Sequence, residues 1–332
     1  MLKPIILLTG LMLSPYVLSD CNPSPAIPGN DVPLSFMHDG VERSYVLHLP
    51  TNYDCETRLP VLVGVHGYGG SGSFWENQWA QIFDHVNEHN YIGLFPDGMH
   101  PSPQHTGVRG FNDLGSQHDD GPDGLTCKPP PMAYPKFDNC PDSYNDRICP
   151  WGNSCADDLG FIRALILHVL ETYATDSSRI YMAGYSQGGS TTSGLAAHLA
   201  DLLAAVAPLH GFQTNGYARG AETNLPYLQV WGTSDTTVPG TGLPASDGLI
   251  YESAEESAAV WAAAQGCSAD GGTHWPSSAD GKQGWHCTHH ADCKKESEVV
   301  SCQWDGAHIW PLDGDDNFGW DVVWAFFMKH HK

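Results

Sequence analysis

Basic residues are scarce in this sequence of 332 residues, which has 15 Lys and Arg against 38 Asp and Glu and a formal net charge of −23. Nucleic acids and anionic membrane surfaces bind clustered Lys and Arg, so this charge excludes both as expected partners. Beyond the first residues, no segment reaches the roughly 18 consecutive apolar residues that a transmembrane helix needs. The sequence also lacks an internal repeat and a linker rich in Ser, Thr, Pro or Gly, which favours one domain over two small ones.

Residues 1–19 have the features of a secretory signal peptide, in the usual order. Lys3 comes first, an apolar run of about a dozen residues follows, and small residues end the segment near Ser19. An uncleaved anchor is disfavoured because the run is short, and a lipid on Cys21 is disfavoured because an acidic residue precedes it. We therefore expect a secreted, extracellular protein in which residues 20–332 form a single domain.

Ten cysteines in an exported chain indicate a set of disulfides, up to five in number. No two of them have the C-x-x-C spacing of a zinc ribbon. Close pairs such as Cys149 with Cys155 and Cys287 with Cys293 suit local bridges across loops, while the full connectivity stays open.

Segments with strand patterns alternate with segments of helical periodicity along most of the chain. The predicted strands are residues 40–50, 59–67, 91–98, 179–185, 204–211, 227–235 and 298–304. The predicted helices are residues 76–89, 187–203 and 252–265, with another beginning after Asp158 and a last one from about 317. This alternation predicts parallel βαβ units, and hence an α/β fold with a doubly wound, mostly parallel sheet and helices on both faces.

The strongest chemical signal is a G-x-S-x-G sequence, Gly184-Tyr185-Ser186-Gln187-Gly188, between a predicted strand and a predicted helix. This context is that of a nucleophile elbow, in which the glycines permit a strained turn that holds the serine hydroxyl clear of the sheet. The motif alone also occurs by chance in Gly- and Ser-rich turns. Its position between strand and helix predicts the α/β-hydrolase fold with Ser186 as nucleophile.

A serine nucleophile needs a histidine to take its proton and a carboxylate to orient that histidine. In this fold the chain order is serine, acid, histidine. Asp235 lies at the end of one predicted strand and His308 follows another. Asp305 is the rival acid, but it lies just before the histidine on the same short loop. The predicted catalytic residues are therefore Ser186, Asp235 and His308.

The segment His66-Gly67-Tyr68-Gly69-Gly70 follows a buried strand, where a loop of the HGGG type supplies a backbone N–H to the oxyanion. We expect the backbone N–H groups of Tyr68 and Gln187 to form the oxyanion hole, each contributing a few kcal/mol to the transition state. His66 is expected to shape this loop rather than to act as a second base.

Seven motifs carry a resemblance to a known family: HGYGGSG (66–72), FPDG (95–98), RGFND (109–113), CADDLGFI (155–162), GYSQGG (184–189), WGTSDTTVP (231–239) and GAHIWP (306–311). In this order they resemble the secreted feruloyl esterases and polyhydroxybutyrate depolymerases over nearly all of the mature chain. In that family the serine of G-x-S-x-G-G, the aspartate of G-x-x-D-x-x-V-P and the histidine of H-x-W-P form the triad. The resemblance therefore implies the same roles for Ser186, Asp235 and His308.

Two departures from the family pattern bear on the substrate rather than on the chemistry. Ala307 and Ile309 flank the histidine where Gly and Ser or Thr are common. Residues 100–153 form a long insert, rich in Gly, Pro and Asp, with cysteines that indicate a fixed shape. A loop of this length in a compact domain is usually functional or disordered. Because it leaves the sheet on the side expected for Ser186, we predict a disulfide-bonded wall or lid over the acyl pocket; an inert surface excursion is the alternative.

Three other groups of residues have a plainer explanation beside the chemical one. Asp157 and Asp158 suit a helix N-terminus, where acids cap the chain and complement the dipole, better than an acid–base pair. Residues 285–293, WHCTHHADC, have the density of a zinc site, but the cysteines favour a disulfide. Residues 313–317, DGDDN, are acidic like a calcium loop but lack the later bidentate Glu. No metal is expected.

Four tryptophans, at 75, 231, 304 and 310, fall on loops or strand ends near the predicted catalytic residues. Trp75, Trp231 and Trp310 are candidate substrate-binding residues, because together they offer an aromatic platform for a phenolic or sugar ring. Ordinary core packing is the alternative.

These residues predict a serine carboxylesterase that works by two-step acyl transfer without a cofactor. The expected substrate is a hydroxycinnamate ester on plant cell-wall polysaccharide, and the alternative is polyhydroxybutyrate or a similar polyester. A serine peptidase is disfavoured because such enzymes on this fold often carry a propeller or an added lid domain. A non-catalytic binding protein is disfavoured because such proteins typically lose a member of the triad.

Overall fold

The computed structural model describes residues 25–73, 82–116, 118–129, 132, 134–149, 151–268, 272–294, 297–314 and 316–332. The signal-peptide prediction and Trp75 lie outside these ranges. Within the described residues, no helix combines the length and apolar character needed to cross a bilayer.

Ten of the described strands form one sheet in the order β1-β2-β4-β3-β7-β8-β9-β12-β11-β10, and β5 and β6 pair separately. Its middle is parallel and consists of β4 (Ile92–Pro96), β3 (Leu59–Val65), β7 (Thr175–Tyr185), β8 (Ala205–Leu209), β9 (Tyr227–Gly232) and β12 (Val299–Trp304). Every residue of β3, β4 and β8 is buried, as expected for parallel strands that are covered on both faces. The carboxyl ends of these strands meet at one edge of the sheet.

Antiparallel strands extend both sides of this parallel middle. On one side, β1 (Asp31–His38) pairs with β2 (Val41–His48), and β2 pairs with β4. On the other side, β11 (His286–His290) and the short β10 (Thr273–His274) continue from β12. The strands β1, β10 and β11 were not expected from the sequence pattern, because short or half-exposed edge strands carry little of the alternation that identifies buried ones.

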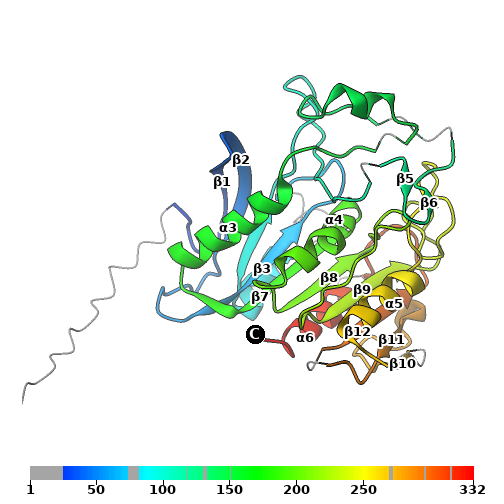
Figure 1. The fold of residues 1–332 in the computed structure, drawn as a ribbon. Helices are drawn as coiled ribbons and strands as arrows, with labels where there is room; N and C mark the ends of the chain where they lie inside the picture. Colours follow the sequence, from blue (N-terminus) through cyan, green and yellow to red (C-terminus); the bar gives the residue numbers. More distant parts are fainter. Residues whose placement is uncertain are drawn as a thin grey trace, which may run out of the picture.

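Helices cover both faces of the sheet, and Figure 1 shows α3, α4 and α5 on the near face with α6 behind. The near face packs against α3 (Asp158–Thr172), α4 (Gln187–Ala196) and α5 (Ala254–Gln265) through one apolar cluster. The far face packs against α2 (Ile82–His89) and α6 (Phe318–Phe327) through a second cluster. The helix predicted at 187–203 ends earlier, at Ala196, and is followed by a 3-10 turn at Ala197–Leu199.

Four disulfides lie within the described residues: Cys127–Cys149, Cys140–Cys155, Cys267–Cys293 and Cys287–Cys302. Cys55 is also disulfide-bonded. The expected local pairs, Cys149 with Cys155 and Cys287 with Cys293, are wrong. The reason for the second error is sheet register, because β11 and β12 place Cys287 directly opposite Cys302.

The insert at 100–153 contains little regular structure and lies at the carboxyl-end edge of the sheet, at the top of Figure 1. It includes the two-residue strands β5 (Asp120–Gly121) and β6 (Gly124–Leu125) and a 3-10 turn at Asp142–Asp146. Two disulfides constrain it, and one of them, Cys140–Cys155, ties it to the segment just before α3. Its path therefore depends on crosslinks and side-chain contacts rather than on a continuous backbone ladder.

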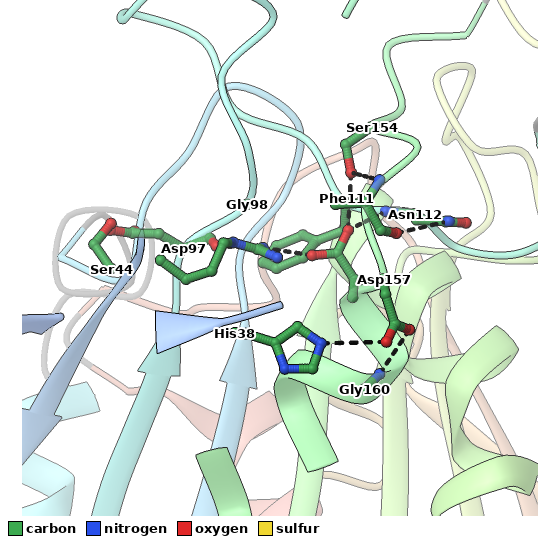
Figure 2. A network of polar contacts seen from close by, with 12 residues as sticks. His38, Ser44, Asp97, Gly98, Phe111, Asn112, Ser154, Asp157 and Gly160 are labelled. Atoms are coloured by element: carbon green, nitrogen blue, oxygen red, sulfur yellow. Dashed lines mark hydrogen bonds and ion pairs between the residues drawn. The ribbon is translucent and has the colours of Figure 1, made fainter. Parts of the chain in front are cut away.

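The start of α3 is anchored by two neighbouring carboxylates with different partners. Asp157 caps the helix, since its Oδ1 accepts a hydrogen bond from the Gly160 backbone N–H at 2.9 Å. Asp158 instead faces Arg43 on β2, and its second oxygen accepts from the backbone N–H of Asn112 at 2.7 Å. Figure 2 shows these contacts, which connect the edge of the sheet, the insert and α3.

Candidate active site

Ser186 stands at a sharp turn between β7 and α4. Its backbone angles are φ 59° and ψ −124°, a strained conformation for a residue with a side chain. The turn is possible because its neighbours are glycines: a Cβ on Gly184 would collide with the Gly188 carbonyl, and one on Gly188 would collide with the Val65 carbonyl. The strand and helix on either side thus hold the serine at the carboxyl-end edge of the sheet, as a nucleophile elbow does.

The structure brings together the three side chains predicted as a triad. The Ser186 hydroxyl lies 2.9 Å from Nε2 of His308, and Nδ1 of His308 lies 2.7 Å from Oδ2 of Asp235. Asp235 follows β9 and His308 follows β12, two adjacent parallel strands. The Tyr185 hydroxyl donates to the His308 backbone carbonyl at 2.9 Å, which fixes the loop that carries the histidine.

Asp235 is a buried carboxylate with several hydrogen-bond donors around it. Its Oδ1 accepts from the backbone N–H groups of Thr237 and Val238, each at 2.9 Å, and its Oδ2 faces two histidines. Burial by itself raises the pKa of this carboxyl, but the hydrogen bonds from His210 and His308 outweigh it and hold the pKa well below its ordinary value. Asp235 is therefore ionised at neutral pH.

The rival acid, Asp305, does not reach the histidine. Its Oδ1 accepts a hydrogen bond from the Thr233 hydroxyl at 3.3 Å. The Nδ1 of His308 faces Asp235 instead. The geometry thus favours the acid that lies on a separate strand end over the one that lies nearer in sequence.

The loop after β3 passes directly beside the serine. A Cβ placed on Gly67 would lie 3.1 Å from the Ser186 Cβ, so the backbone at this point approaches as closely as it can. The two residues whose N–H groups are predicted to form the oxyanion hole are Tyr68, the next residue of this loop, and Gln187, the first residue of α4. The Ser186 side chain makes no capping hydrogen bond to the first turn of α4.

His66 holds the loop after β3 in place through hydrogen bonds at both ring nitrogens. It is fully buried, its Nδ1–H donates to the Gly67 carbonyl at 2.7 Å, and its Nε2 accepts from the Gly98 backbone N–H at 2.9 Å. Burial lowers the pKa of His66 to about 4, so the ring is neutral at physiological pH. Asp97 adds a second tie, since its Oδ1 accepts from the Gly72 N–H at 2.7 Å.

The insert contacts both sides of the predicted oxyanion hole. The side-chain amide of Gln187 donates to the Gly152 carbonyl at 3.0 Å and to the Asn153 side chain at 2.6 Å. The Tyr68 ring stacks on Trp151 at 6.0 Å between centroids and meets the edge of Tyr134 at 5.2 Å. The end of the insert therefore packs against the two residues whose backbone N–H groups are predicted to bind the oxyanion.

The tryptophans predicted to bind substrate have different surroundings. Trp231 is partly buried and packs against a cluster that includes Trp151 and Val238, close to Asp235. Trp310 requires a correction: it is only 5% exposed, belongs to the core beneath the sheet and has its ring beside Trp320. Strand-end position alone did not reveal that the chain turns this ring inward.

His210, which was not expected as a functional residue, contacts the predicted acid. Its Nδ1 lies 3.0 Å from Oδ2 of Asp235. The available signal was the sequence Leu209-His210-Gly211, which places a histidine at the carboxyl end of a predicted strand. Such a position gathers active-site groups in doubly wound sheets.

The cysteines at 287 and 293 and the side chains around Asp235 carry atoms of the kind that bind metals, and these atoms are engaged in other contacts. Cys287 and Cys293 are in disulfides, so neither offers a thiolate to zinc. His210, Asp235 and His308 have ligand atoms within 4.8 Å of one another, as a metal would require. Both histidine Nδ1 atoms, however, face the same carboxylate oxygen at hydrogen-bond distance, so the group already has internal partners.

No protein family model matches the chain, but comparison with known proteins gives sequence relatives that are named feruloyl esterases. It is 26% identical over 189 residues to a protein named probable feruloyl esterase C from Aspergillus flavus, an alignment that covers 55% of this chain and 68% of the relative. It is also 26% identical over 181 residues to feruloyl esterase B from Thermothelomyces thermophilus, covering 54% of this chain and 48% of that protein.

Among solved structures, the acetyl xylan esterase from Aspergillus awamori superposes with a TM-score of 0.54 and covers 86% of this chain and 94% of that one, at 15% identity. This likeness shows the fold, and it confirms the prediction of an α/β-hydrolase. The sequence relatives confirm the predicted resemblance: the chain is a carboxylesterase similar to feruloyl esterases.

Proposed function

We propose that this carboxylesterase is an extracellular feruloyl esterase, which cleaves hydroxycinnamate esters of plant cell-wall polysaccharide with Ser186, His308 and Asp235 as its catalytic triad. The observation that carries the proposal is the continuous line of hydrogen bonds from the serine hydroxyl through the histidine to a buried carboxylate. The names of the sequence relatives support the hydroxycinnamate ester as substrate.

In the first half of the reaction, the Ser186 oxygen attacks the ester carbonyl while His308 takes the hydroxyl proton at Nε2. The backbone N–H groups of Tyr68 and Gln187 stabilise the negative charge that develops on the carbonyl oxygen. Asp235 stabilises the imidazolium and keeps the proton of the ring on Nδ1. His308 then donates its Nε2 proton to the leaving alcohol of the polysaccharide, and an acyl-enzyme remains.

In the second half, water replaces the alcohol. His308 takes a proton from that water, the resulting hydroxide attacks the acyl-enzyme, and Ser186 leaves with the proton from the histidine. The hydroxycinnamic acid is released and the serine is restored. Each proton in this cycle passes through Nε2 of His308. Every step is carried out by side chains and backbone N–H groups of the protein, so the proposed reaction uses no cofactor.

Aromatic side chains of the insert support the proposal that the enzyme recognises an aromatic acyl group. Tyr68, Tyr134 and Trp151 form a cluster of rings beside the oxyanion loop, with Trp151 and Tyr134 in edge-to-face contact at 4.5 Å. Rings in this arrangement offer the faces and edges that a phenolic ring prefers. We therefore propose that the insert forms one wall of the acyl pocket.

The disulfides support export. Disulfides persist in oxidising compartments and are rare in the cytosol, and the described part of the chain contains no free cysteine. This agrees with the proposed signal peptide at residues 1–19.

The proposal is tested with a substrate panel and one variant. The purified protein is assayed with methyl ferulate, feruloylated arabinoxylan, acetylated xylan and a film of polyhydroxybutyrate, and kcat/KM or released product is compared. A preference for the two ferulates is expected, and S186A is expected to lose both esterase activity and labelling by a fluorophosphonate probe. Activity of a folded S186A variant would refute the mechanism, and a preference for the polyester would refute the substrate.

A further inference from the structure

We propose that His210 is a positioning residue of this esterase: it donates from Nδ1 to Asp235 and so holds the carboxylate oxygen that orients His308. The inference rests on the proposed function, because it concerns the acid of the same triad. It differs from the triad itself in that His210 touches neither the serine nor the reacting ester.

His210 occupies a rigid place at the end of β8. Its backbone N–H donates to the Val230 carbonyl of β9 at 2.8 Å, and its φ of 49° turns the chain sharply at that point. The side chain is fully buried. The ring lies 5.7 Å from the His308 ring and 5.6 Å from the Tyr185 ring, measured between centroids.

Two partners determine which nitrogen of His210 carries the proton. The indole N–H of Trp304 lies 3.2 Å from Nε2, and an indole nitrogen only donates, so Nε2 must accept and be unprotonated. The proton is then on Nδ1, where it faces the ionised Asp235. Burial lowers the pKa of His210, although its hydrogen bond to Asp235 opposes this, so the ring is neutral at neutral pH. One tautomer therefore satisfies both contacts.

This donor completes the shell around Asp235. Each carboxylate oxygen receives two N–H groups: Thr237 and Val238 on Oδ1, and the two histidines on Oδ2. Four fixed donors leave the carboxylate no other rotation to adopt. Without His210, the buried Oδ2 of Asp235 would keep His308 as its one side-chain donor. The carboxylate would then be held less firmly, and its negative charge would be less dispersed.

The charged and titratable groups that face His210 are Asp235, His308 and Tyr185. A neutral His210 adds no positive charge to this set, but its hydrogen bond disperses the charge on Asp235. Removal of the donor therefore strengthens the attraction between Asp235 and a protonated His308. On the acid side of the pH profile, activity falls because His308 is protonated and cannot act as the base. This fall in activity should therefore occur at higher pH when the donor is removed.

The test compares H210N with H210Q. The amide nitrogen of Asn occupies nearly the place of Nδ1 and still reaches Asp235, and Asn tolerates positive φ. Gln places its terminal amide at the position of Nε2, where the amide oxygen can accept from the Trp304 N–H and no N–H reaches Asp235. Hydrolysis of p-nitrophenyl acetate is followed from pH 4 to 9. The concentration of active sites is determined by fluorophosphonate titration, so that kcat is calculated for folded enzyme alone.

The expected result is a loss of about tenfold or more in kcat for H210Q, with KM within about twofold and an acid limb displaced to higher pH by about half a unit or more. H210N should retain much of kcat and the wild-type acid limb. Equal kcat values and equal acid limbs for the two variants would show that His210 only fills space. Residual activity in S186A would instead refute the proposed function and leave the role of His210 unsupported.

A measurement on the unaltered protein does not depend on either variant folding. Nitrogen-15 chemical shifts of the histidine rings, assigned with W304F, report which nitrogen carries the proton. The inference expects Nδ1 of His210 to be protonated and Nε2 to be unprotonated at neutral pH. A proton on Nε2 would overturn it, because Nδ1 would then have no hydrogen to donate to Asp235.

Discussion

Arg43 on β2 and Asp158 at the start of α3 form an ion pair in which both side chains are almost fully buried. The Arg43 Nη2 lies 2.5 Å from Oδ1 of Asp158, and the other carboxylate oxygen accepts hydrogen bonds from Asn112 of the insert and from Ser154, which directly follows it. Figure 2 labels Asn112 and Ser154, which lie close to Asp157 at the start of α3. Arg43 also donates to the Asp97 backbone carbonyl at 3.1 Å, and the Asp97 side chain accepts from the Gly72 N–H just after the oxyanion loop, so the ion pair is connected to the catalytic edge of the sheet.

The variant R43M should lower the free energy of unfolding by about 3–5 kcal/mol, because it leaves the buried carboxylate of Asp158 without its counter-ion. Urea unfolding followed by tryptophan fluorescence measures this. The matched control is R163A, which removes an exposed ion pair with Asp201 and should cost no more than about 1 kcal/mol. Equal losses in the two variants would contradict the role assigned to burial.

The variant D235N should reduce kcat about 10⁴-fold while the protein stays folded, because the histidine loses the carboxylate that holds its tautomer. D305N is the control, since Asp305 bonds to Thr233 and should affect kcat by less than about threefold. Steady-state kinetics on methyl ferulate compare them. A larger loss in D305N than in D235N would mean that the acid has been misassigned.

The Asp235 carboxylate should also make stability depend on pH. Its pKa is lower in the folded protein than the ordinary value of about 3.9, so its ionised form stabilises the fold. This contribution is fully present above that ordinary value and is lost as the pH falls through the folded pKa. The difference in unfolding free energy between wild type and D235N should therefore be constant from about pH 6 to 8 and shrink below about pH 4. A difference that grew toward acid would contradict the sign.

Removal of metal ions should leave the activity unchanged. The proposed mechanism uses only side chains and backbone N–H groups, and the histidines nearest to Asp235 are hydrogen-bonded to it. Activity on methyl ferulate is measured before and after dialysis against EDTA. Loss of activity that added zinc or calcium restores would show that a metal takes part.

The variant Y134L should change substrate preference rather than abolish catalysis. Tyr134 meets Tyr68 and Trp151 edge to face, so its loss should open the proposed acyl wall and lower kcat/KM for methyl ferulate about 3- to 10-fold relative to p-nitrophenyl acetate. L125A lies on the same insert at an exposed position and should leave the ratio within about twofold. An unchanged ratio in Y134L would make the insert a surface feature without a role in specificity.

The sequence by itself determined the parts of this protein that depend on neighbouring residues. Glycines around Ser186 are needed to make a sharp strand-to-helix turn, so the elbow could be recognised from five letters in context. The strands β3, β4 and β8, in which every residue is buried, could be located because covered parallel strands are largely apolar. Chain order then indicated Asp235 and His308, since the strand ends of such a sheet meet on one edge.

Tertiary structure alone decided what depends on register, rotamer and packing between distant segments. Cys287 pairs with Cys302, rather than with the nearer Cys293, because two antiparallel strands place them opposite each other. The Trp310 ring turns into the core, and His210 points at Asp235 because β8 and β9 are adjacent. Local pattern says which residues reach the edge of the sheet, but the direction of each side chain there is chosen by contacts that are far apart in the sequence.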